Sequence, residues 1–459
     1  DLDNILNNYN IIKLMVLKLY NTFGRKKQIF KPIKKGHVGI YSCGLTVYNY
    51  GHIGNYRAFV SSDILRKYLE YKGYKVKKVV NITDVDDKTI RDSIKEGKSL
   101  KEFTEKYTHA FFEDEKNLNI KPADFYPKAT EHIKDIVDIV KILLNKKIAY
   151  KTNDGIYFNI KKFKNYGKLS GIKIEKLKSS VRINNDEYDK NNVCDFALWK
   201  FYNEKDGNIF WETELGKGRP GWHIECSAMS TKYLGKSFDV HTGGIDLIFP
   251  HHENEIAQSE KSTNKKFVNY WLHNEWIIVD GRKMSKSLGN YYTIKDIIKM
   301  NYNPIALRYF YLSGHYRSQI NFTLNNLRNA QNSLDRLKRI IAEIKDDGKE
   351  NKEYLKLFEK AMDDDLDSVN AIQILWNLVR DKKAHGKIKT IEKMDSVLGL
   401  NLLKKEELDI PLEILKLIEE REKARKNKDW KLADNLRDKI SQKGWKIDDR
   451  GEKSNVSKI

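Results

Sequence analysis

The chain has 459 residues, of which 85 are Lys or Arg and 64 are Asp or Glu, so its formal net charge is +21. This length predicts about two to four domains, and the excess of positive charge favours a polyanionic partner such as nucleic acid. The three cysteines exclude a disulfide framework and favour a reducing compartment. No apolar run approaches the ~20 residues that span a bilayer, and no signal peptide is evident, so a soluble cytoplasmic protein is expected.

The first residues differ from the rest of the chain. Residues 1–14 are polar and rich in asparagine, and Met15 begins an apolar segment that predicts a strand. We therefore expect residues 1–14 to be an N-terminal extension and Met15 to be the natural start.

A strand–helix–strand unit follows. The apolar run Val38–Ser42 predicts a buried strand that ends at Cys43, residues 56–73 have helical periodicity, and Lys75–Val80 predicts a second strand. Such a unit has a right-handed crossover and parallel strands, so Cys43 and Thr83 are expected at the same edge of the sheet, where open α/β sheets bind ligands. From residue types alone, Thr83 and its acidic neighbours are better explained as a capped polar turn.

The remaining chain changes character several times. Residues 91–148 have helical periodicity, and residues 150–210 break into short strands and loops, which predicts an insertion between two halves of a sheet. Residues 211–280 return to strands and polar motifs. Residues 296–443 are nearly all amphipathic helix, and Gly444–Asp449 predicts a small hairpin.

Two thiols, one imidazole and one carboxylate are candidate zinc ligands: Cys43, Cys226, His251 and Glu255. This donor set suits a tetrahedral zinc ion. Pro250 is placed to open a helix, which would put His251 and Glu255 four residues apart on one face. From residue types alone, two buried thiols and an exposed helix face explain the same residues better.

Spacing does not settle the ligand set. His223, His241 and His252 compete as ligands, and Cys194 is expected to be a core thiol.

The segment Lys283-Met-Ser-Lys-Ser287 follows a predicted strand and is flanked by glycines, which suits a triphosphate. Lys283 and Lys286 can neutralise charge that develops on a pyrophosphate leaving group. A basic surface turn would explain this segment alone. Its pairing with His52-Ile-Gly-Asn55, near the N-terminus of a predicted helix that offers free N–H groups to phosphate, favours a nucleotide site.

These two segments resemble the two signatures of class I aminoacyl-tRNA synthetases. Four longer segments resemble the cysteinyl-tRNA synthetases specifically: Tyr41–Tyr48, Asn81–Asp87, Gly221–Met229 and Phe249–Glu255. The resemblance runs from about Leu17 to about Asp449. It implies an α/β fold, with a Rossmann-like parallel-sheet catalytic domain, an inserted connective domain and a C-terminal α-helical bundle.

The resemblance also implies domain boundaries. After the extension at 1–14, the catalytic domain would occupy 15–110 and 211–280, interrupted by the connective insertion at 111–210. The remaining parts would be a KMSKS loop and stem-contact region at 281–325 and a helical anticodon-binding domain with a small C-terminal element at 326–459.

Roles for single residues follow from the same resemblance. One Zn²⁺ per chain, held by Cys43, Cys226, His251 and Glu255, would bind the substrate thiolate, and the amino-acid pocket would be lined by Cys43, Thr83, Trp222 and His251. ATP, with Mg²⁺, would be bound by His52, Asn55, Lys283, Ser285 and Lys286, of which all but Ser285 would be catalytic. Asn55 stands where the family often has histidine, and its amide can still donate to a phosphate oxygen.

The implied activity is the activation of L-cysteine with ATP and its transfer to the 3′ end of tRNA-Cys by a monomeric enzyme. The basic helical third would read the anticodon, with Trp430 and Trp445 as candidates for base stacking, although buried helix packing explains both tryptophans better. Two alternatives are a mycothiol-type cysteine ligase and a catalytically silent RNA-binding paralogue. The basic helical extension favours tRNA over an amino-sugar, and the complete signatures argue against a silent paralogue.

Overall fold

The computed structural model describes residues 16–172, 182–183, 195–285, 288–404, 411–450 and 453–458. The chain forms two compact units, residues 1–403 and 404–459. The predictions for residues 1–14, Cys194 and Lys286 lie outside the described residues. Within the described ranges, no helix is long and apolar enough to cross a membrane.

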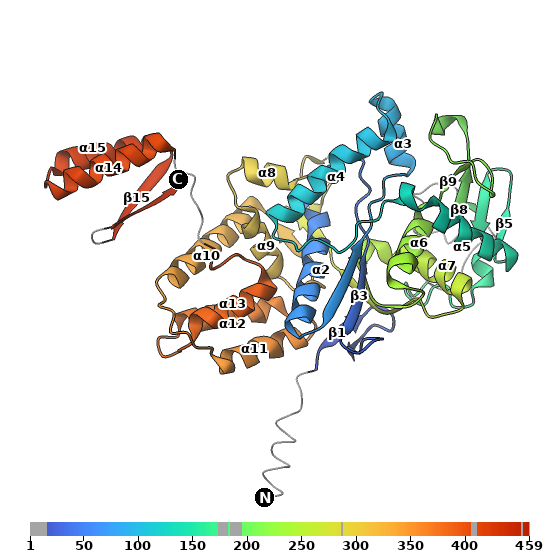
Figure 1. The fold of residues 1–459 in the computed structure, drawn as a ribbon, viewed down its shortest axis with the longest axis horizontal. Helices are drawn as coiled ribbons and strands as arrows, with labels where there is room; N and C mark the ends of the chain where they lie inside the picture. Colours follow the sequence, from blue (N-terminus) through green and yellow to red (C-terminus); the bar gives the residue numbers. More distant parts are fainter. Residues whose placement is uncertain are drawn as a thin grey trace, which may run out of the picture. The chain divides into compact units, whose positions relative to one another are not determined.

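A four-stranded parallel sheet lies at the centre of the first unit, in the order β11-β10-β3-β4 (Figure 1). Its strands are β3 (His37–Ser42), β4 (Lys75–Val80), β10 (Phe238–Gly244) and β11 (Val268–Asn274). The chain continues outward from β3 to β4 on one side and from β10 to β11 on the other. The boundary between β3 and β10 is therefore the topological switch point, where such sheets bind ligands.

Helix α2 (Ile53–Tyr71) connects β3 to β4 and packs across all four strands of the sheet. It begins three residues earlier than predicted because His52 and Asn55 form a capping box: each side chain accepts a hydrogen bond from the other residue's main-chain N–H. The first signature thus caps the helix that follows the central strand.

The region predicted as an insertion forms helices and a second sheet. Its helices are α3 (Asp87–Lys95), α4 (Leu100–Asn117) and α5 (Ile133–Asn145). The sheet has the order β5-β6-β8-β7, with β9 also paired to β8, and comprises β5 (Ala149–Lys151), β6 (Gly155–Phe158), β7 (Arg182–Ile183), β8 (Asp195–Phe201) and β9 (Gly218–Pro220). Helices α6 (Trp222–Leu234) and α7 (Glu253–Thr263) flank β10 in the sequence and pack against each other.

Two further small sheets complete the strands of this unit. Strands β1 (Lys18–Asn21) and β2 (Lys26–Ile29) form a hairpin, and β1 packs against β11. The Lys283 segment is carried by a second group of strands, β12 (Ile277–Val279), β13 (Arg282–Lys283) and β14 (Ile320–Phe322).

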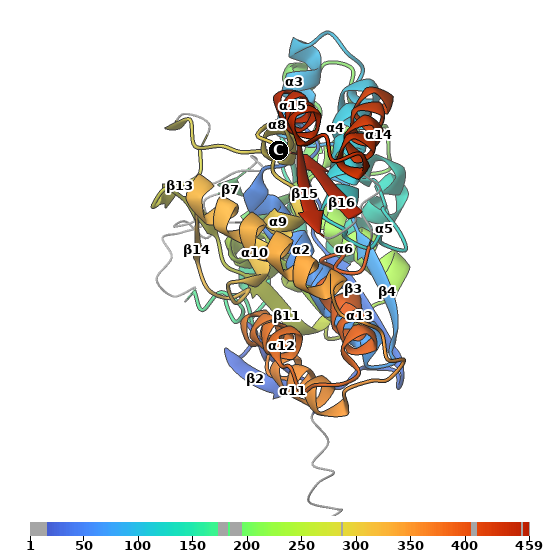
Figure 2. The same cartoon turned by 90° about the vertical axis from the view of Figure 1, so that its left-hand side faces the viewer.

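Helices fill the rest of the first unit. They are α8 (Ile294–Lys299), α9 (Pro304–Leu312), α10 (Leu324–Ala342), α11 (Lys352–Asp363), α12 (Ser368–Arg380) and α13 (Lys387–Leu398). Helices α11, α12 and α13 pack against one another, and α10 packs on α9 and α12 (Figure 2). The predicted breaks near 346–351 and 383–389 coincide with the ends of these helices.

The second unit is a helical hairpin followed by a β-hairpin. Helices α14 (Leu412–Lys426) and α15 (Trp430–Gln442) precede β15 (Trp445–Arg450) and β16 (Lys453–Lys458), so the predicted C-terminal hairpin is confirmed. The expected buried packing is right for Trp445, which is 6% exposed, and wrong for Trp430, which is 59% exposed. Trp430 opens α15 on the helix surface, whereas Trp445 belongs to the small core of this unit.

A fully buried ion pair fixes α2 to the helical part of the first unit. Asp63 Oδ2 lies 2.6 Å from Arg308 Nη2 and 2.8 Å from Lys67 Nζ. Arg308 also donates to the Leu398 carbonyl at the end of α13. Burial alone would raise the pKa of Asp63, but the two cations outweigh burial and lower this pKa to about 2. The carboxylate therefore joins α2, α9 and α13.

We expect Asp63→Asn to lower the free energy of unfolding by about 3–5 kcal/mol, because it leaves the Arg308 guanidinium buried without its counter-charge. Since the pKa of Asp63 is lowered by folding, its contribution is present above about pH 4 and is lost as the pH falls toward 2. Urea unfolding of the full chain at several pH values measures both effects. Asp364→Asn, which removes an exposed pair with Lys27, is the control and should cost under ~1 kcal/mol. Equal losses in the two variants would contradict the prediction.

Candidate metal and nucleotide site

The candidate metal ligands meet at the switch point of the sheet. Cys43 follows β3, and its N–H donates to the Thr242 carbonyl in β10 at 3.3 Å. Cys226 lies in α6, and His251 and Glu255 lie in the turn after β10 and the first turn of α7. Three segments that are distant in the sequence therefore reach one place because β3 and β10 are neighbours.

The donor atoms of Cys43, Cys226, His251 and Glu255 all lie within 4.8 Å of one another. Cys43 Sγ is 3.8 Å from Glu255 Oε1, and His251 Nε2 is 3.0 Å from the same oxygen. His251 and Glu255 are on one face, four residues apart, as predicted. The alternative of an exposed helix face is wrong, because the Glu255 side chain is fully buried.

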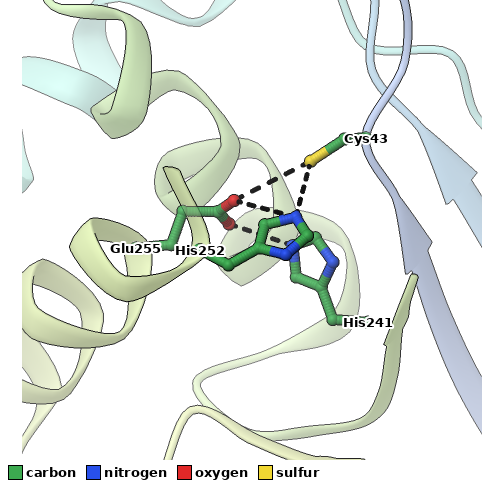
Figure 3. Close-up of side chains that lie close together, drawn as sticks. All are labelled: Cys43, His241, His252 and Glu255. Carbon is green, nitrogen blue, oxygen red and sulfur yellow. Dashed lines mark hydrogen bonds and ion pairs between the residues drawn. The ribbon is translucent and has the colours of Figure 1, made fainter. Parts of the chain in front are cut away.

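A second group of donors overlaps the first and consists of Cys43, His241, His252 and Glu255. Figure 3 shows His252 beside the Cys43 sulfur, with Nε2 3.3 Å from Sγ, and His241 Nε2 3.0 Å from Glu255 Oε2. The two groups share a thiol and a carboxylate. His241 and His252 were expected from the sequence to compete as metal ligands, and the structure leaves both as candidates.

Further buried histidines hold the inner ones in place. His223 Nδ1 lies 2.9 Å from His251 Nδ1, so His251 presents its Nε2 atom to Glu255. His252 Nδ1 lies 2.7 Å from His273 Nε2, and His273 Nδ1 lies 2.7 Å from the Thr22 hydroxyl. Sequence reasoning missed His273, which the pairing of β11 with β10 brings to the cluster, and Thr22, which the packing of β1 on β11 brings there.

The charges of the cluster suit a divalent cation. Burial raises the pKa of Cys43 and would raise that of Cys226, but the Cys43 hydrogen bond and His251 lower the pKa of Cys226 to about 6. Burial would raise the pKa of Glu255, which His241 and His251 lower to about 2. Burial would lower the pKa of His251, yet the thiolate and the carboxylate raise it to about 10. The proton on His251 thus interacts with the Cys226 thiolate and the Glu255 carboxylate. A bound cation would interact with the same two anions.

The residues expected in an amino-acid pocket lie beside this cluster. The Trp222 ring centroid is 4.4 Å from that of His251. Thr83 is buried, and its N–H donates to the Leu45 carbonyl at 3.1 Å, so it is joined to the segment that follows Cys43. A Cβ atom on Gly44 would lie 1.6 Å from the Asn81 carbonyl oxygen, so this segment approaches the end of β4 only with glycine there. Trp222 therefore lies beside His251, Thr83 lies beside the segment that follows Cys43, and their role in binding stays a prediction.

The first nucleotide segment forms the cap of α2. The Asn55 N–H donates to His52 Nδ1 at 3.2 Å, and the His52 N–H donates to Asn55 Oδ1 at 3.0 Å. The side-chain oxygen of Asn55 is thus used within the cap, and its Nδ2 amide is the group with hydrogens to donate. Both side chains are half-buried.

The second nucleotide segment lies next to the first. Lys283 is exposed at the end of β13, and the Ser285 N–H donates to Asn290 Oδ1 at 2.8 Å. A Cβ atom on Gly54 would lie 3.5 Å from Met284 Cε, so the structure brings the two segments together. Lys286 lies outside the described residues, and its predicted role in ATP binding is not tested.

Comparison with known proteins shows the family of the chain. The family model of the class I tRNA synthetase (C) catalytic domain matches residues 29–332. The cysteine–tRNA ligase of Protochlamydia amoebophila is 44% identical, covering 98% of this chain and all of the relative. That of Brachyspira hyodysenteriae is 45% identical, covering 94% of this chain and 97% of the relative. This chain belongs to the cysteine–tRNA ligase family.

Solved structures agree on the fold. A Mycobacterium tuberculosis methionyl-tRNA synthetase in complex with methionyl-adenylate has a TM-score of 0.54 at 11% identity, covering 80% of this chain and 88% of that chain. A ternary complex of Agrobacterium radiobacter LeuRS has a TM-score of 0.56 at 11% identity, covering 82% and 84%. This chain thus has the fold of the class I synthetases, as expected from the sequence.

Proposed function

We propose that this chain is a cysteine–tRNA ligase that activates L-cysteine with ATP and transfers the cysteinyl group to the 3′ end of tRNA-Cys. The observation that carries this proposal is the convergence of two thiols, a histidine and a glutamate at the ligand-binding edge of the sheet. It occurs in a chain related over nearly its full length to cysteine–tRNA ligases. The proposed enzyme is a cytoplasmic monomer.

We further propose that one zinc ion is held by Cys43, Cys226, His251 and Glu255. Two thiolates, an imidazole and a carboxylate are a zinc donor set, and the mutual separation of their atoms within 4.8 Å fits a single ion. When bound, zinc would coordinate the substrate thiolate. Because an alcohol is a much poorer anionic ligand at neutral pH, serine would be rejected without a proofreading domain.

The hydrogen bonds around the cluster favour this ligand set over the one with His241 and His252. Metal-bound histidines and carboxylates are commonly oriented by outer partners. His241 Nε2 donates to Glu255 Oε2, which leaves Oε1 on the side of Cys43 and His251. His223 occupies Nδ1 of His251 and leaves its Nε2 atom for the ion. His241 and His223 thus act as outer partners of two ligands.

The ATP half of the reaction needs positioning and charge stabilisation, because the carboxylate of cysteine is itself the nucleophile. The cap of α2 offers the Asn55 side-chain amide to phosphate oxygens, and the His52 ring lies beside it. Lys283 and Lys286 would stabilise the departing pyrophosphate, with Mg²⁺ accompanying ATP and Ser285 contributing a hydroxyl.

The remaining parts would bind the tRNA. We propose that residues 281–325 contact the acceptor stem and that residues 326–459 reach the anticodon. Trp430, which is 59% exposed in the second unit, has a ring face available to stack on an unpaired base. The match to cysteine–tRNA ligases includes this C-terminal part, which supports tRNA rather than an amino-sugar as the acceptor.

The ligand set is tested by the zinc content of two variants. We expect Cys226→Ala to retain almost no zinc after dialysis, because it removes a ligand. His241→Ala should keep about one zinc per chain at saturating metal, with an affinity reduced about 10–100-fold, because it removes an outer partner. Inductively coupled plasma mass spectrometry measures both. The reverse result, with zinc retained in Cys226→Ala and lost in His241→Ala, would assign the ion to the other set.

The reaction is tested by cysteine-dependent exchange between ATP and pyrophosphate, followed by charging of tRNA-Cys. We expect cysteine to be preferred to serine by more than ~10⁴-fold, beyond the ~10²-fold that a pocket sensing shape alone provides. Lys283→Ala should lower the exchange rate by about 10²-fold or more while leaving the zinc content unchanged. Absence of cysteine-dependent exchange in the zinc-loaded chain would refute the proposed function and support the silent paralogue.

The role of Trp430 is tested separately. Trp430→Ala should raise the KM for tRNA-Cys by about tenfold, since one base stack contributes about 1–3 kcal/mol, and should leave pyrophosphate exchange unchanged. Leu412→Ala, which shortens an exposed apolar side chain of the same unit, is the control. An unchanged tRNA KM in Trp430→Ala would exclude the stacking role.

A further inference from the structure

Arg57 makes an unusual set of contacts close to the nucleotide site. It lies on α2 two residues after Asn55 and is 1% exposed. Its guanidinium donates to four main-chain carbonyl oxygens: Nη1 to those of Glu275 at 2.8 Å and Trp276 at 2.9 Å, and Nη2 to those of His315 at 3.0 Å and Ser318 at 2.5 Å.

The four carbonyl groups belong to two segments that lead into the small sheet of the Lys283 segment. Glu275 and Trp276 connect β11 to β12, and His315 and Ser318 precede β14. Strands β12 and β14 are parallel neighbours, and β12 turns directly into the antiparallel strand β13. Arg57 therefore binds both segments that lead into the small sheet. This sheet carries Lys283.

The same helix also holds the far end of the nucleotide loop. After the loop, the Ile53 N–H donates to the Tyr292 carbonyl at 2.9 Å, and the Ile53 carbonyl accepts from the Tyr311 hydroxyl at 2.7 Å. The segment between Trp276 and Tyr292 is thus fixed to the first two turns of α2 at both of its ends. Arg57 fixes its N-terminal end.

Burying the charged guanidinium of Arg57 costs free energy, which a residue that only fills space would not require. Burial lowers the pKa of Arg57 to about 10, so the side chain stays protonated at neutral pH. Among the hydrogen bonds of the described residues, Arg57 donates to no carboxylate, and its buried Nε has no partner. Four carbonyl dipoles therefore stabilise the charge, to which the charge of Glu275 also contributes. The geometry fits a guanidinium fork and does not fit the single ammonium group of lysine.

We propose that Arg57 is a positioning residue for adenylate formation, which sets the distance between the cap of α2 and the Lys283 segment. This inference rests on the proposed function. Groups on both sides must face the same triphosphate, and a misplacement of about 1 Å in such a site can reduce the rate by about 10²-fold. The cysteine site lies at the ends of β3 and β10 and does not involve the four carbonyl groups.

The test compares Arg57→Met and Arg57→Lys with Arg66→Met. Arg66 is the matched control because it lies on the same helix, is 3% exposed, and donates instead to Glu70, Pro122 and Asp124. In pyrophosphate exchange, both Arg57 variants should show a raised KM for ATP and a kcat lowered by about 10²-fold, the lysine variant less severely. The Kd for cysteine measured without ATP, and the zinc content, should stay within twofold of the wild type.

Amide hydrogen exchange supplies a readout that does not need activity. Exchange at Ile277–Val279 and Ile320–Phe322 should become at least tenfold faster in Arg57→Met and stay unchanged in Arg66→Met. A folded Arg57→Met variant with normal exchange at these strands and a normal KM for ATP would overturn the proposal. So would the failure of both Arg57 variants to fold while Arg66→Met folds, because Arg57 would then be a determinant of folding alone.

Failure of the proposed function gives a different result. The wild-type chain would then show no cysteine-dependent pyrophosphate exchange, while the amide exchange of the Arg57 variants would still show whether this residue fixes the two strands.

Discussion

Parallel pairing of β3 with β10 is the constraint on which the site depends. Three buried hydroxyl groups join these strands and α2: Ser42 Oγ lies 2.7 Å from Thr242 Oγ1 and 2.8 Å from Ser62 Oγ. At the other end, Asp239 accepts a hydrogen bond from the Gly39 N–H at 2.8 Å. These contacts set the register between two halves of the sheet that a long insertion separates in the sequence. Cys43 and the turn after β10 reach the same point only in that register.

Helix α2 connects this sheet to the rest of the first unit. Its N-terminus forms the candidate phosphate site, and its C-terminal half is tied to α11, where the Tyr68 hydroxyl donates to Asp363 at 2.7 Å. The sheet, α2 and the helices from α9 to α13 share one hydrophobic core. A domain boundary at residue 326 is therefore not a break in packing, since residues 1–403 form one compact unit.

Local patterns in the sequence predicted the helices and strands well. They could not predict which strands, distant in the sequence, pair with each other. The strands before Cys43 and Thr83 follow from apolar runs, and the i, i+4 relation of His251 and Glu255 follows from Pro250. The true start of α2 was missed because a histidine is an unusual helix cap. Periodicity does not show that β3 pairs with β10, so the meeting of the candidate ligands rested on the family resemblance.

The same limit applies to the outer histidines and to Trp430. His273 is brought to His252 by neighbouring strands and Thr22 by the packing of a separate hairpin, and neither relation leaves a mark in local spacing. Whether Trp430 is exposed depends on which face of the α14–α15 hairpin packs against the small core of the second unit. Residue type predicts the average burial of tryptophan and cannot assign the face in a single case.

The buried histidines explain how the cluster can be both polar and ready for a cation. Burial and neighbouring histidines lower the pKa of His252 and His223, and burial with His241 lowers that of His273 to about 3. These rings are therefore neutral at physiological pH. The neutral rings of His252 and His223 orient the Cys43 thiol and His251 through hydrogen bonds without adding positive charge that would repel a metal ion. The net negative charge of the inner groups therefore remains available to a bound cation.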